Sequence, residues 1–346
     1  MSRILLAILV IEFAIGARAR AADESNPPAS NAVDSSIASG LAYLAKQQSA
    51  DGAVDASGAP RVATTGLALM AFLAAGNTPD DGQYGRSVRR AIDFLVQSAP
   101  ADDGYFGKLD GSRMYGHGIV TLALAEAYGV EPDEQNRAAI RAVLARAVAV
   151  ILKAHDIQKP SEHQGGWRYE PNSLDSDLSL SGWNILALRA AGNIGIDVPK
   201  DHVDRARSYV LQCYNKLQRG FAYQPRQDAS IGMTGLAVLD LCLLDAATAR
   251  DEVAHGVQLL LDHPVTAETR FPYYTMYYVT QAAFQIGEPP WPIIWRSTRD
   301  RLLKEQSPDG GWPQSRSGEE PGRVYATSMA ILTLSVPKGL LPTYQR

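Results

Sequence analysis

The 346-residue chain has only two cysteines and six histidines. So few cysteines exclude a scaffold held together by disulfides. No set of His, Cys and Asp residues has the spacing of a zinc site, so we expect no metal and no cofactor. A basic surplus is also absent, because 33 Lys and Arg stand against 37 Asp and Glu. Nucleic acid, which needs a basic face, is therefore not an expected partner.

The two cysteines, Cys213 and Cys242, fall in helical stretches that form the arms of one antiparallel hairpin, with its turn near 218–229. Folding that hairpin leaves Cys242 about seven residues, or roughly 10 Å, beyond the position opposite Cys213. This exceeds the Cα separation of ~7 Å that a disulfide tolerates. We expect two buried thiols.

A long hydrophobic run is lacking as well. The longest, from Ile4 to Ala17, is broken by Glu12 and is shorter than the about 20 residues that span a bilayer. With Arg3 before it and small residues up to Ala21 after it, residues 1–21 are typical of a secretory signal peptide. We therefore expect an exported protein, periplasmic or extracellular. Residues 22–35 have no apolar period and are expected to form a flexible lead.

What the chain does contain is one unit repeated six times over residues 36–346. Each unit has an amphipathic helix, a turn and a second helix rich in Ala and Leu, and four of the six turns contain Gly and an aromatic residue. One position inside the second helices recurs every 44 to 64 residues or so, at Gly66, Gly118, Gly182, Gly235, Val279 and Met329. The repeats predict a single all-α domain of twelve helices in six hairpins.

The second helices are expected to lie inside. They carry small residues on consecutive turns, such as Gly66, Ala71 and Ala75, which allow close approach, whereas the first helices carry charged residues along one face. No unit is an obvious polar cap, which favours a closed α/α toroid over an open solenoid.

The sixth turn, "KEQSPDGGW" at 304–312, has weaker echoes at 46–54 and 163–169. It resembles the QW motif of the prenyltransferase and squalene-oxidase repeat families, which include squalene cyclases and the β-subunits of protein prenyltransferases. The resemblance implies a squalene cyclase-like, terpenoid cyclase/protein prenyltransferase α/α toroid. Physically, Gln306 can bond orphan helix carbonyls, Gly310 and Gly311 permit the turn, and Trp312 covers the adjoining helix pair.

In such a ring the N-termini of the inner helices meet at one end of the central cavity, where their partial positive charges favour anions or electron-rich groups. A long apolar ligand with a polar head suits this site. The residues expected there are Arg61, Tyr115, His117, Asp175, Asp177, Asp228, Tyr273, Tyr274, Arg323 and Tyr325. Trp167 is a candidate for stacking on a ligand, although aromatics at helix ends usually pack.

The stretch "GGWRYEPNSLDSDLSLSGW", residues 165–183, holds the candidate acids Asp175 and Asp177. The resembling class II cyclases protonate their substrate with an Asp-x-Asp-Asp motif. Here Leu178 follows Asp177, and alignment on Ser181-Gly182 matches only Asp177, to the first Asp of that motif. The alternative is that these aspartates cap the helix that follows.

Three functions stay open. The first is an exported protein that binds an apolar or isoprenoid-like molecule in the central cavity, with peripheral membrane contact as a further partner. The second is a cyclase-like isomerase with Asp177 or Asp175 as proton donor. The third is a polysaccharide-active toroid, since such rings often carry paired carboxylates. The missing zinc set argues against a protein prenyltransferase, and neither cysteine has the Cys-Gly-Glu-Gln sequence of the thioester proteins that share the ring.

Overall fold

The computed structural model describes residues 27–55, 61–245, 249–266, 268–316, 318 and 320–345. The expected signal peptide, residues 1–21, lies outside the described residues, as do residues 22–26 of the expected lead.

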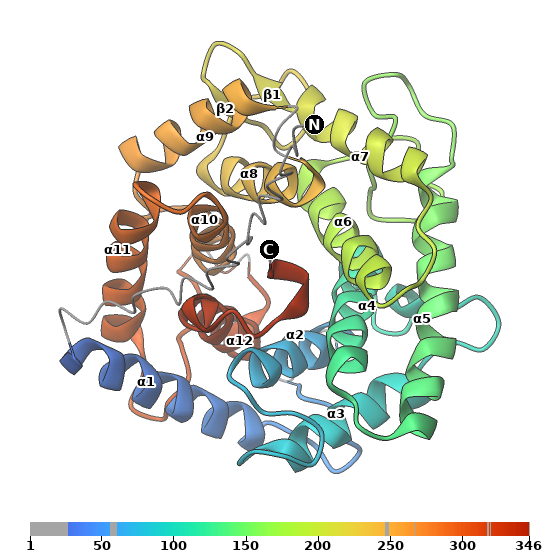
Figure 1. The fold of residues 1–346 in the computed structure, drawn as a ribbon, viewed down its shortest axis with the longest axis vertical. Coiled ribbons are helices and arrows are strands. Elements are labelled where there is room, and N and C mark those ends of the chain that lie inside the picture. The colour runs from blue at the N-terminus through green and yellow to red at the C-terminus, as the bar shows by residue number, and fades with distance from the viewer. Residues whose placement is uncertain are drawn as a thin grey trace, which may run out of the picture.

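Twelve described helices alternate between an outer and an inner ring (Figure 1). The outer helices are α1 (Pro27–Lys46), α3 (Gly85–Gln97), α5 (Glu134–His155), α7 (Lys200–Gln212), α9 (Arg250–Asp262) and α11 (Pro290–Glu305). The inner helices are α2 (Arg61–Ala74), α4 (Arg113–Val130), α6 (Leu178–Asn193), α8 (Ile231–Asp245), α10 (Pro272–Ile286) and α12 (Gly322–Leu334). The predicted all-α toroid of six hairpins is confirmed.

Short elements decorate the loops. Strands β1 (Tyr214–Asn215) and β2 (Gly220–Phe221) pair antiparallel, with Tyr214 opposite Phe221, and form the turn of the fourth unit. The 3-10 helix η1 (Phe106–Lys108) lies in the second turn, and η3 (Val336–Lys338) and η4 (Pro342–Tyr344) follow α12.

The expected flexible lead, residues 22–35, differs from the structure, because α1 begins at Pro27. Val33 lies inside that segment and is buried together with Ile37, Leu41 and Leu44. These four residues recur at helical spacing on one face, which packs on the ring. The apolar stripe therefore starts earlier in the chain than the polar composition of the segment indicates.

The ring closes between its first and last units, where α12 packs against both α1 and α2. Gln306 makes this seam specific: its Nε2 donates to the Ser36 carbonyl of α1 at 2.9 Å and to the Gly310 carbonyl at 2.7 Å. In return, the Ser36 hydroxyl donates to Gln306 Oε1 at 2.7 Å. Gln306 thus bonds carbonyls, but not orphan carbonyls at a helix end as predicted, because Ser36 lies in the interior of α1 and Gly310 lies in the turn. The bonds to Ser36 join two different units. Gln48 repeats the arrangement in the first unit, donating to Gly52 and to Ser87 of the next outer helix.

A second buried hydrogen bond fastens the loops to the inner ring. A backbone N–H at the end of the loop donates to a side-chain acceptor near the start of the inner helix. The pairs are Val54 to Thr65 (2.9 Å), Phe106 to His117 Nδ1 (3.3 Å), Trp167 to Ser181 (3.0 Å), Phe221 to Thr234 (2.9 Å) and Trp312 to Thr327 (2.9 Å). We call these five contacts the loop staples.

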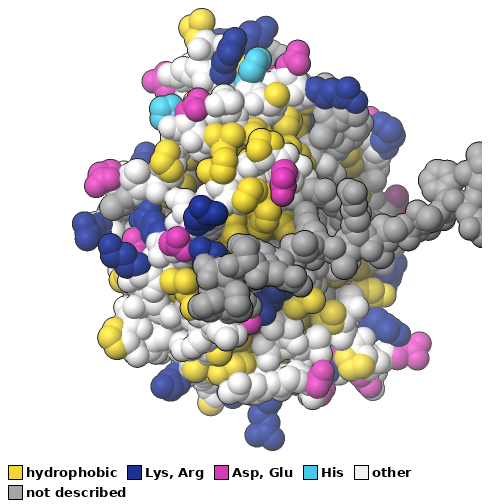
Figure 2. All heavy atoms as spheres, turned by 60° about the vertical axis from the view of Figure 1, so that its left-hand side comes forward, with side chains coloured by type: hydrophobic (Ala, Val, Ile, Leu, Met, Phe, Trp, Pro, Cys, Tyr) yellow, Lys and Arg dark blue, Asp and Glu magenta, His cyan; other side chains and the backbone are white. Residues whose placement is uncertain are grey.

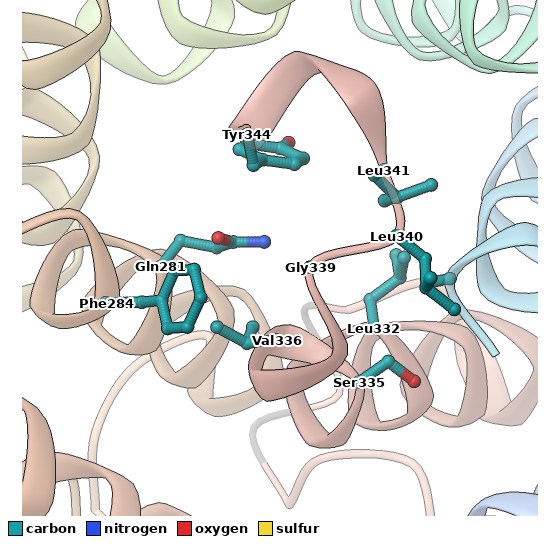
Figure 3. Close-up of a pocket in the computed structure, with 10 residues that line it drawn as sticks. Gln281, Phe284, Leu332, Ser335, Val336, Gly339, Leu340, Leu341 and Tyr344 are labelled. Carbon is teal, nitrogen blue, oxygen red and sulfur yellow. The ribbon is translucent and has the colours of Figure 1, made fainter. Parts of the chain in front are cut away.

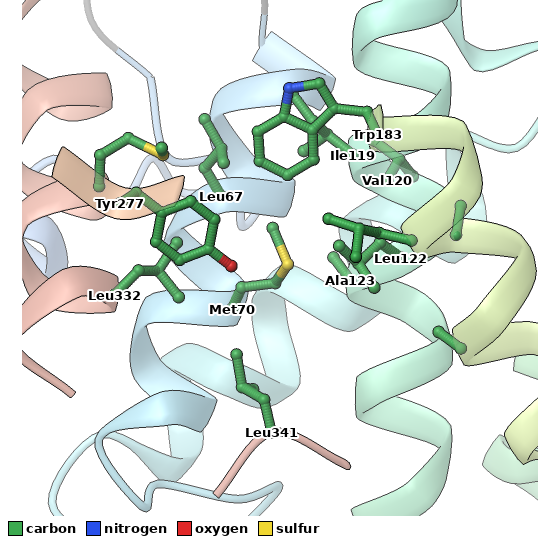
Figure 4. Packing of buried hydrophobic residues seen from close by; sticks show 14 of the residues in the cluster. Leu67, Met70, Ile119, Val120, Leu122, Ala123, Trp183, Tyr277, Leu332 and Leu341 are labelled. Atoms are coloured by element: carbon green, nitrogen blue, oxygen red, sulfur yellow. The ribbon is translucent and has the colours of Figure 1, made fainter. Parts of the chain in front are cut away.

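The axis of the ring is filled with side chains. Leu67 and Met70 of α2, Ile119 of α4, Trp183 of α6 and Tyr277 of α10 point toward one another and are buried (Figure 4). The sequence predicts an apolar central cavity. In the structure, large aromatic side chains of the inner helices fill the space that the small residues leave.

Residues 335–345, here called the tail, enter the ring at the C-terminal ends of the inner helices (Figure 3). A hollow of about 20 Å³ remains beside the tail, lined in part by Gln281, Phe284, Leu341 and Tyr344. Such a volume holds roughly one water molecule.

The seam makes Gly310 sensitive to substitution. Its φ is +90°, and a Cβ there would come within 2.3 Å of the Ser39 carbonyl oxygen of α1. We expect Gly310→Ala to lower the free energy of unfolding by about 3 kcal/mol or more, through backbone strain and steric conflict. Urea denaturation followed by circular dichroism measures the loss.

Gly192→Ala is the matched control, because a Cβ at Gly192 in α6 meets no atom within 4 Å. That variant should be as stable as the wild type or slightly more stable. Equal midpoints for the two variants would show that the close approach at the seam does not constrain the ring.

Candidate functional site

The first turn of each inner helix contributes one side chain that is buried or half-buried at the same end of the ring, and we call this set the axial mouth. Its members are Ala63, Tyr115, Ser179, Met233, Tyr274 and Tyr325, one from each inner helix. Apart from the half-buried Tyr115, each keeps a few per cent of its surface exposed. The mouth combines three phenol groups with the small or apolar side chains of Ala63, Ser179 and Met233.

Three predicted residues, Tyr115, Tyr274 and Tyr325, therefore meet at the mouth. The Tyr115 and Ser179 hydroxyls are hydrogen-bonded to each other. Burial, followed by the proximity of Tyr115 and Tyr325, raises the pKa of Tyr274 well above its ordinary value. The Tyr274 hydroxyl is buried and has no hydrogen-bond partner within the described part of the chain.

Asp177 is the N-cap of α6 and has no exposed side-chain surface. Its Oδ1 accepts from the Leu180 N–H at 2.9 Å and from the Ser179 hydroxyl at 2.7 Å. Its Oδ2 accepts from Arg168 Nη1 at 2.5 Å and from the Tyr223 hydroxyl at 2.9 Å. Both oxygens are thus engaged by donors, which suits a capping, ion-paired carboxylate, and neither oxygen is turned toward a substrate.

Arg168 organises the loop around this acid. Its Nε pairs with Asp175 at 3.0 Å, and its guanidinium lies over the rings of Tyr169 and Tyr223 at 4.6 and 5.5 Å. Although burial opposes it, the hydrogen bond and charge of Asp177 hold the pKa of Arg168 above its usual range. Asp175 is 44% exposed, so the two aspartates differ in environment although they share one cation.

Lys159 also holds this loop in place, through hydrogen bonds from its side chain. Its buried ammonium donates to the Gly166 carbonyl at 2.5 Å and to Ser176 Oγ at 3.0 Å, and burial lowers the pKa of Lys159 to about 8. A serine beside such a lysine has the composition of a nucleophilic pair. Ser176 is fully buried, however, and donates its own proton to the His163 carbonyl at 2.8 Å. No substrate carbonyl can approach its oxygen in this arrangement.

His117 does not face the mouth, contrary to its predicted ligand-binding role. Its Nδ1 accepts the loop staple from Phe106, so Nε2 carries the proton and donates to the Ala147 carbonyl of α5 at 3.0 Å. Burial lowers the pKa of His117 to about 4. The imidazole is neutral, because burial disfavours its charged form. The ring occupies the place that Thr or Ser has in the other staples.

Trp167 is also turned away from the mouth. Its indole N–H donates to the Ile151 carbonyl of α5 at 2.9 Å, and its ring stacks on His155 at 4.2 Å. It packs between the two helix layers, as the structural alternative for this residue predicts.

The remaining predicted residues lie around the mouth rather than in it. Arg323 pairs with Asp309 and lies over Tyr43, on the outer layer. Asp228 is exposed and accepts from Gln218 at 3.0 Å. Arg61 pairs with Asp51 and Asp55. Tyr273 is buried and donates to the Pro313 carbonyl at 2.9 Å.

Sequence reasoning missed Arg168, Lys159 and Tyr223. Arg168 directly follows the Gly-Gly-Trp of the third turn, a signal that could have been found. Lys159 and Tyr223 reach the site only through loop geometry.

An apolar groove of about 550 Å³ lies between α9 and the start of α11, and hydrophobic side chains gather on the face of the molecule shown in Figure 2. It is lined by Arg250, Val253, Ala254, Val257, Ile286, Pro289 and Pro290. It lacks the converging polar groups that orient a small molecule. Cys213 and Cys242 form no disulfide, as predicted, and Cys213 is buried as expected, whereas Cys242 is only partly buried.

Among the described residues, no group of three or more His, Cys, Asp and Glu side chains could hold a metal ion. The described helices also include none that is long and apolar enough to cross a membrane.

The two aspartates should respond differently to removal of their charge. We expect Asp177→Asn to lower the free energy of unfolding by about 2 to 4 kcal/mol, because it breaks a buried pair with Arg168. Asp175→Asn should cost less than about 1 kcal/mol, because that pair is partly exposed. Urea denaturation tests both, and equal small losses would mean that Asp177 is not held for stability.

The neutral His117 adds a pH-dependent contribution to stability. An unfolded histidine has a pKa near 6.5, so acid favours the unfolded state between about pH 6.5 and the folded pKa of about 4. We expect the stability advantage of the wild type over His117→Thr, which keeps a staple acceptor, to shrink by about 3 kcal/mol from pH 7 to pH 4. A pH-independent difference between their unfolding free energies would show that His117 is not held neutral.

No protein-family model matches the chain, and no curated protein sequence matches it either. Solved structures do resemble it. An inactive variant of the α-1,6-mannanase of Salegentibacter sp. HEL1_6, with two aspartates replaced, in complex with α-1,6-mannotriose, has a TM-score of 0.63 at 10% identity. That match covers 89% of this chain and 98% of the mannanase.

A variant of the type II terpene cyclase MstE from Scytonema, in complex with merosterolic acid A, has a TM-score of 0.60 at 14% identity, covering 91% of this chain and 99% of the cyclase. A glycosidase variant in complex with glucose has a TM-score of 0.62 at 15% identity, covering 90% and 98%. At these identities the similarity shows the fold alone: the chain is an α/α toroid, a fold that it shares with terpene cyclases and glycoside hydrolases.

Proposed function

We propose that the protein is an exported squalene cyclase-like repeat protein that binds a small molecule with an apolar body and a polar head at the axial mouth. The observation that carries this proposal is the Tyr274 hydroxyl, which is buried among mouth residues without a partner. A buried polar group of this kind is costly unless a ligand or water satisfies it. Leu67, Ile119 and Trp183 follow one helical turn further along α2, α4 and α6 and form an apolar floor of the mouth, against which the body of the ligand lies.

The fold neighbours support a ligand role, because toroids of this kind were solved in complex with a terpenoid product and with an oligosaccharide. They also keep an enzyme in consideration. For the cyclase-like isomerase, however, a proton donor must reach the substrate. Asp177 is fully engaged by four donors, and Asp175 faces solvent beside Arg168. Binding at the mouth therefore accounts for the site better than acid catalysis by this pair.

Titration with geranylgeraniol, followed by tryptophan fluorescence, tests the proposal. We expect saturable binding to the wild type and a threefold to tenfold weaker affinity in Tyr274→Phe, which removes about one hydrogen bond. Tyr214→Phe is the control, because the Tyr214 hydroxyl bonds His255 in the outer layer. An absence of binding, or equal affinities in both variants, contradicts the proposal.

The same samples discriminate the alternatives. Conversion of geranylgeraniol by the wild type but not by Asp177→Asn would establish the cyclase-like isomerase. Cleavage of α-1,6-mannotetraose would establish the polysaccharide-active toroid, for which the mannanase similarity is the supporting observation. We expect neither reaction.

A further inference from the structure

The opposite end of the ring holds the tail by contacts from three inner helices. The Tyr344 hydroxyl bonds the Tyr277 hydroxyl of α10 at 2.6 Å, and Gln285 Nε2 donates to the Tyr344 carbonyl at 2.7 Å. The Thr343 N–H donates to Glu126 Oε1 of α4 at 3.1 Å, and the Thr343 carbonyl accepts from Arg189 Nε of α6, also at 3.1 Å. The tail is thus held by hydrogen bonds to polar side chains of the inner helices.

Several buried polar atoms beside the tail have no hydrogen-bond partner among the described residues. Asp240 of α8 is completely buried, and neither of its carboxyl oxygens has a partner among the residues that the structure describes. Glu126 Oε2 and Gln281 Oε1 are also buried without partners, and Gln281 lines the hollow beside Tyr344 (Figure 3). Four unpartnered atoms are therefore oxygens of carboxyl or amide groups, which accept hydrogen bonds.

These groups lie together around Tyr344. Asp240 is seven residues after Met233 of the mouth, two helical turns along the same face of α8, or about 10 Å deeper in the ring. Glu126 accepts from the Thr343 N–H beside Tyr344, Gln281 lines the hollow next to Tyr344, and Asp240 lies on α8, which packs against α10. Burial, followed by the electrostatic effects of Tyr277, Glu126 and Asp240, raises the pKa of Tyr344 well above its ordinary value, in agreement with this arrangement. We call the part of the ring interior that the tail shares with Glu126, Asp240 and Gln281 the tail chamber.

Aromatic side chains flank the chamber. The Tyr277 and Tyr278 ring centroids lie 5.1 Å apart, and Tyr278 meets the ring of Trp183 edge to face at 5.7 Å. The faces of such rings attract organic cations. The nearby cation of the chain, Arg189, already donates to the Leu243 and Thr343 carbonyls.

We propose that the tail chamber is a second binding site, for an organic amine with an apolar stem, and that the tail occupies it in this structure. Two carboxyl groups and an amide oxygen provide acceptors for ammonium N–H donors, and the phenol and indole rings cover the stem. The ligand enters as the tail leaves. The site is entered from the opposite end of the ring to the axial mouth. The two proposals share Trp183, but the acceptors of the chamber, Glu126, Asp240 and Gln281, are not members of the mouth.

The protonation state of the acids agrees with this assignment. Burial raises the pKa of Glu126 to about 7 and that of Asp240 well above its ordinary value. A neutral carboxyl group that receives an ammonium ligand becomes ionised, because the opposite charge favours the carboxylate. Binding of an amine should therefore release protons from the chamber.

Calorimetric titration of the full chain with 1,6-diaminohexane tests the site, and 1,6-hexanediol is the uncharged comparator of the same length. We expect the diamine to bind and the diol not to bind. Repeating the diamine titration in two buffers of different ionisation enthalpy at the same pH should show net proton release. No diamine binding, or equal binding of the diol, would overturn the proposal.

Asp240→Asn and Glu126→Gln should each weaken diamine binding at least tenfold. Asp240→Asn keeps the shape and removes an unpaired buried acid, so its urea midpoint should equal or exceed that of the wild type. Glu320→Gln is the matched control: Glu320 is also buried and has one unpartnered carboxyl oxygen, but it bonds the Tyr274 N–H at the mouth end. If this control loses as much affinity as the other two, the diamine does not bind in the tail chamber.

Tyr344→Ala tests whether the tail competes with the ligand. Loss of the bond to Tyr277 should loosen the tail and tighten diamine binding severalfold, because an occupied site binds with reduced apparent affinity. Weaker binding in Tyr344→Ala would overturn the role of the tail as a competing occupant.

Discussion

The ring depends on one kind of contact, the backbone N–H of a loop donating to a buried acceptor on the inner helix that follows. Such a bond contributes about 1 kcal/mol, but an unmade one leaves a buried donor and costs more. Thr327, Thr234 and Thr65 supply hydroxyl acceptors, whereas His117 supplies a ring nitrogen at the same place. The contact ties the preceding loop to the first turns of five of the six inner helices, and hence helps to fix which first-turn side chains form the mouth.

The architecture could be predicted from the sequence because it is written six times. A repeated spacing indicates the hairpins, small residues identify the inner ring, and the Gln306–Trp312 turn indicates how neighbouring units join. Residues that depart from the repeat were harder to interpret. His117 was interpreted as a ligand-binding residue because its equivalence to the Thr and Ser acceptors of the other units cannot be recognised before the staple hydrogen bonds are known.

The site was predictable in part for a similar reason. Tyr115, Tyr274 and Tyr325 follow from their positions in the first turns of inner helices. The behaviour of Asp177 does not, because its partners Arg168 and Tyr223 come from two loops whose approach no local pattern encodes. The two ends of the axis also differ in charge. The acid at the helix N-termini is paired with arginine, whereas burial keeps Glu126 and Asp240 at the opposite end in or near their neutral form, where helix dipoles disfavour negative charge.

The seam between Gln306 and Ser36 joins residues 270 positions apart. In an open array, each repeat can fray from an end while its neighbours stay folded. A closed ring has no terminal repeat to fray, and its last joint pairs the two ends of the folded domain. Forming the seam costs conformational entropy, because it closes nearly the whole chain into a loop, although this cost grows only slowly with loop length. The seam should accordingly form late in folding, and the domain should unfold in a single cooperative transition.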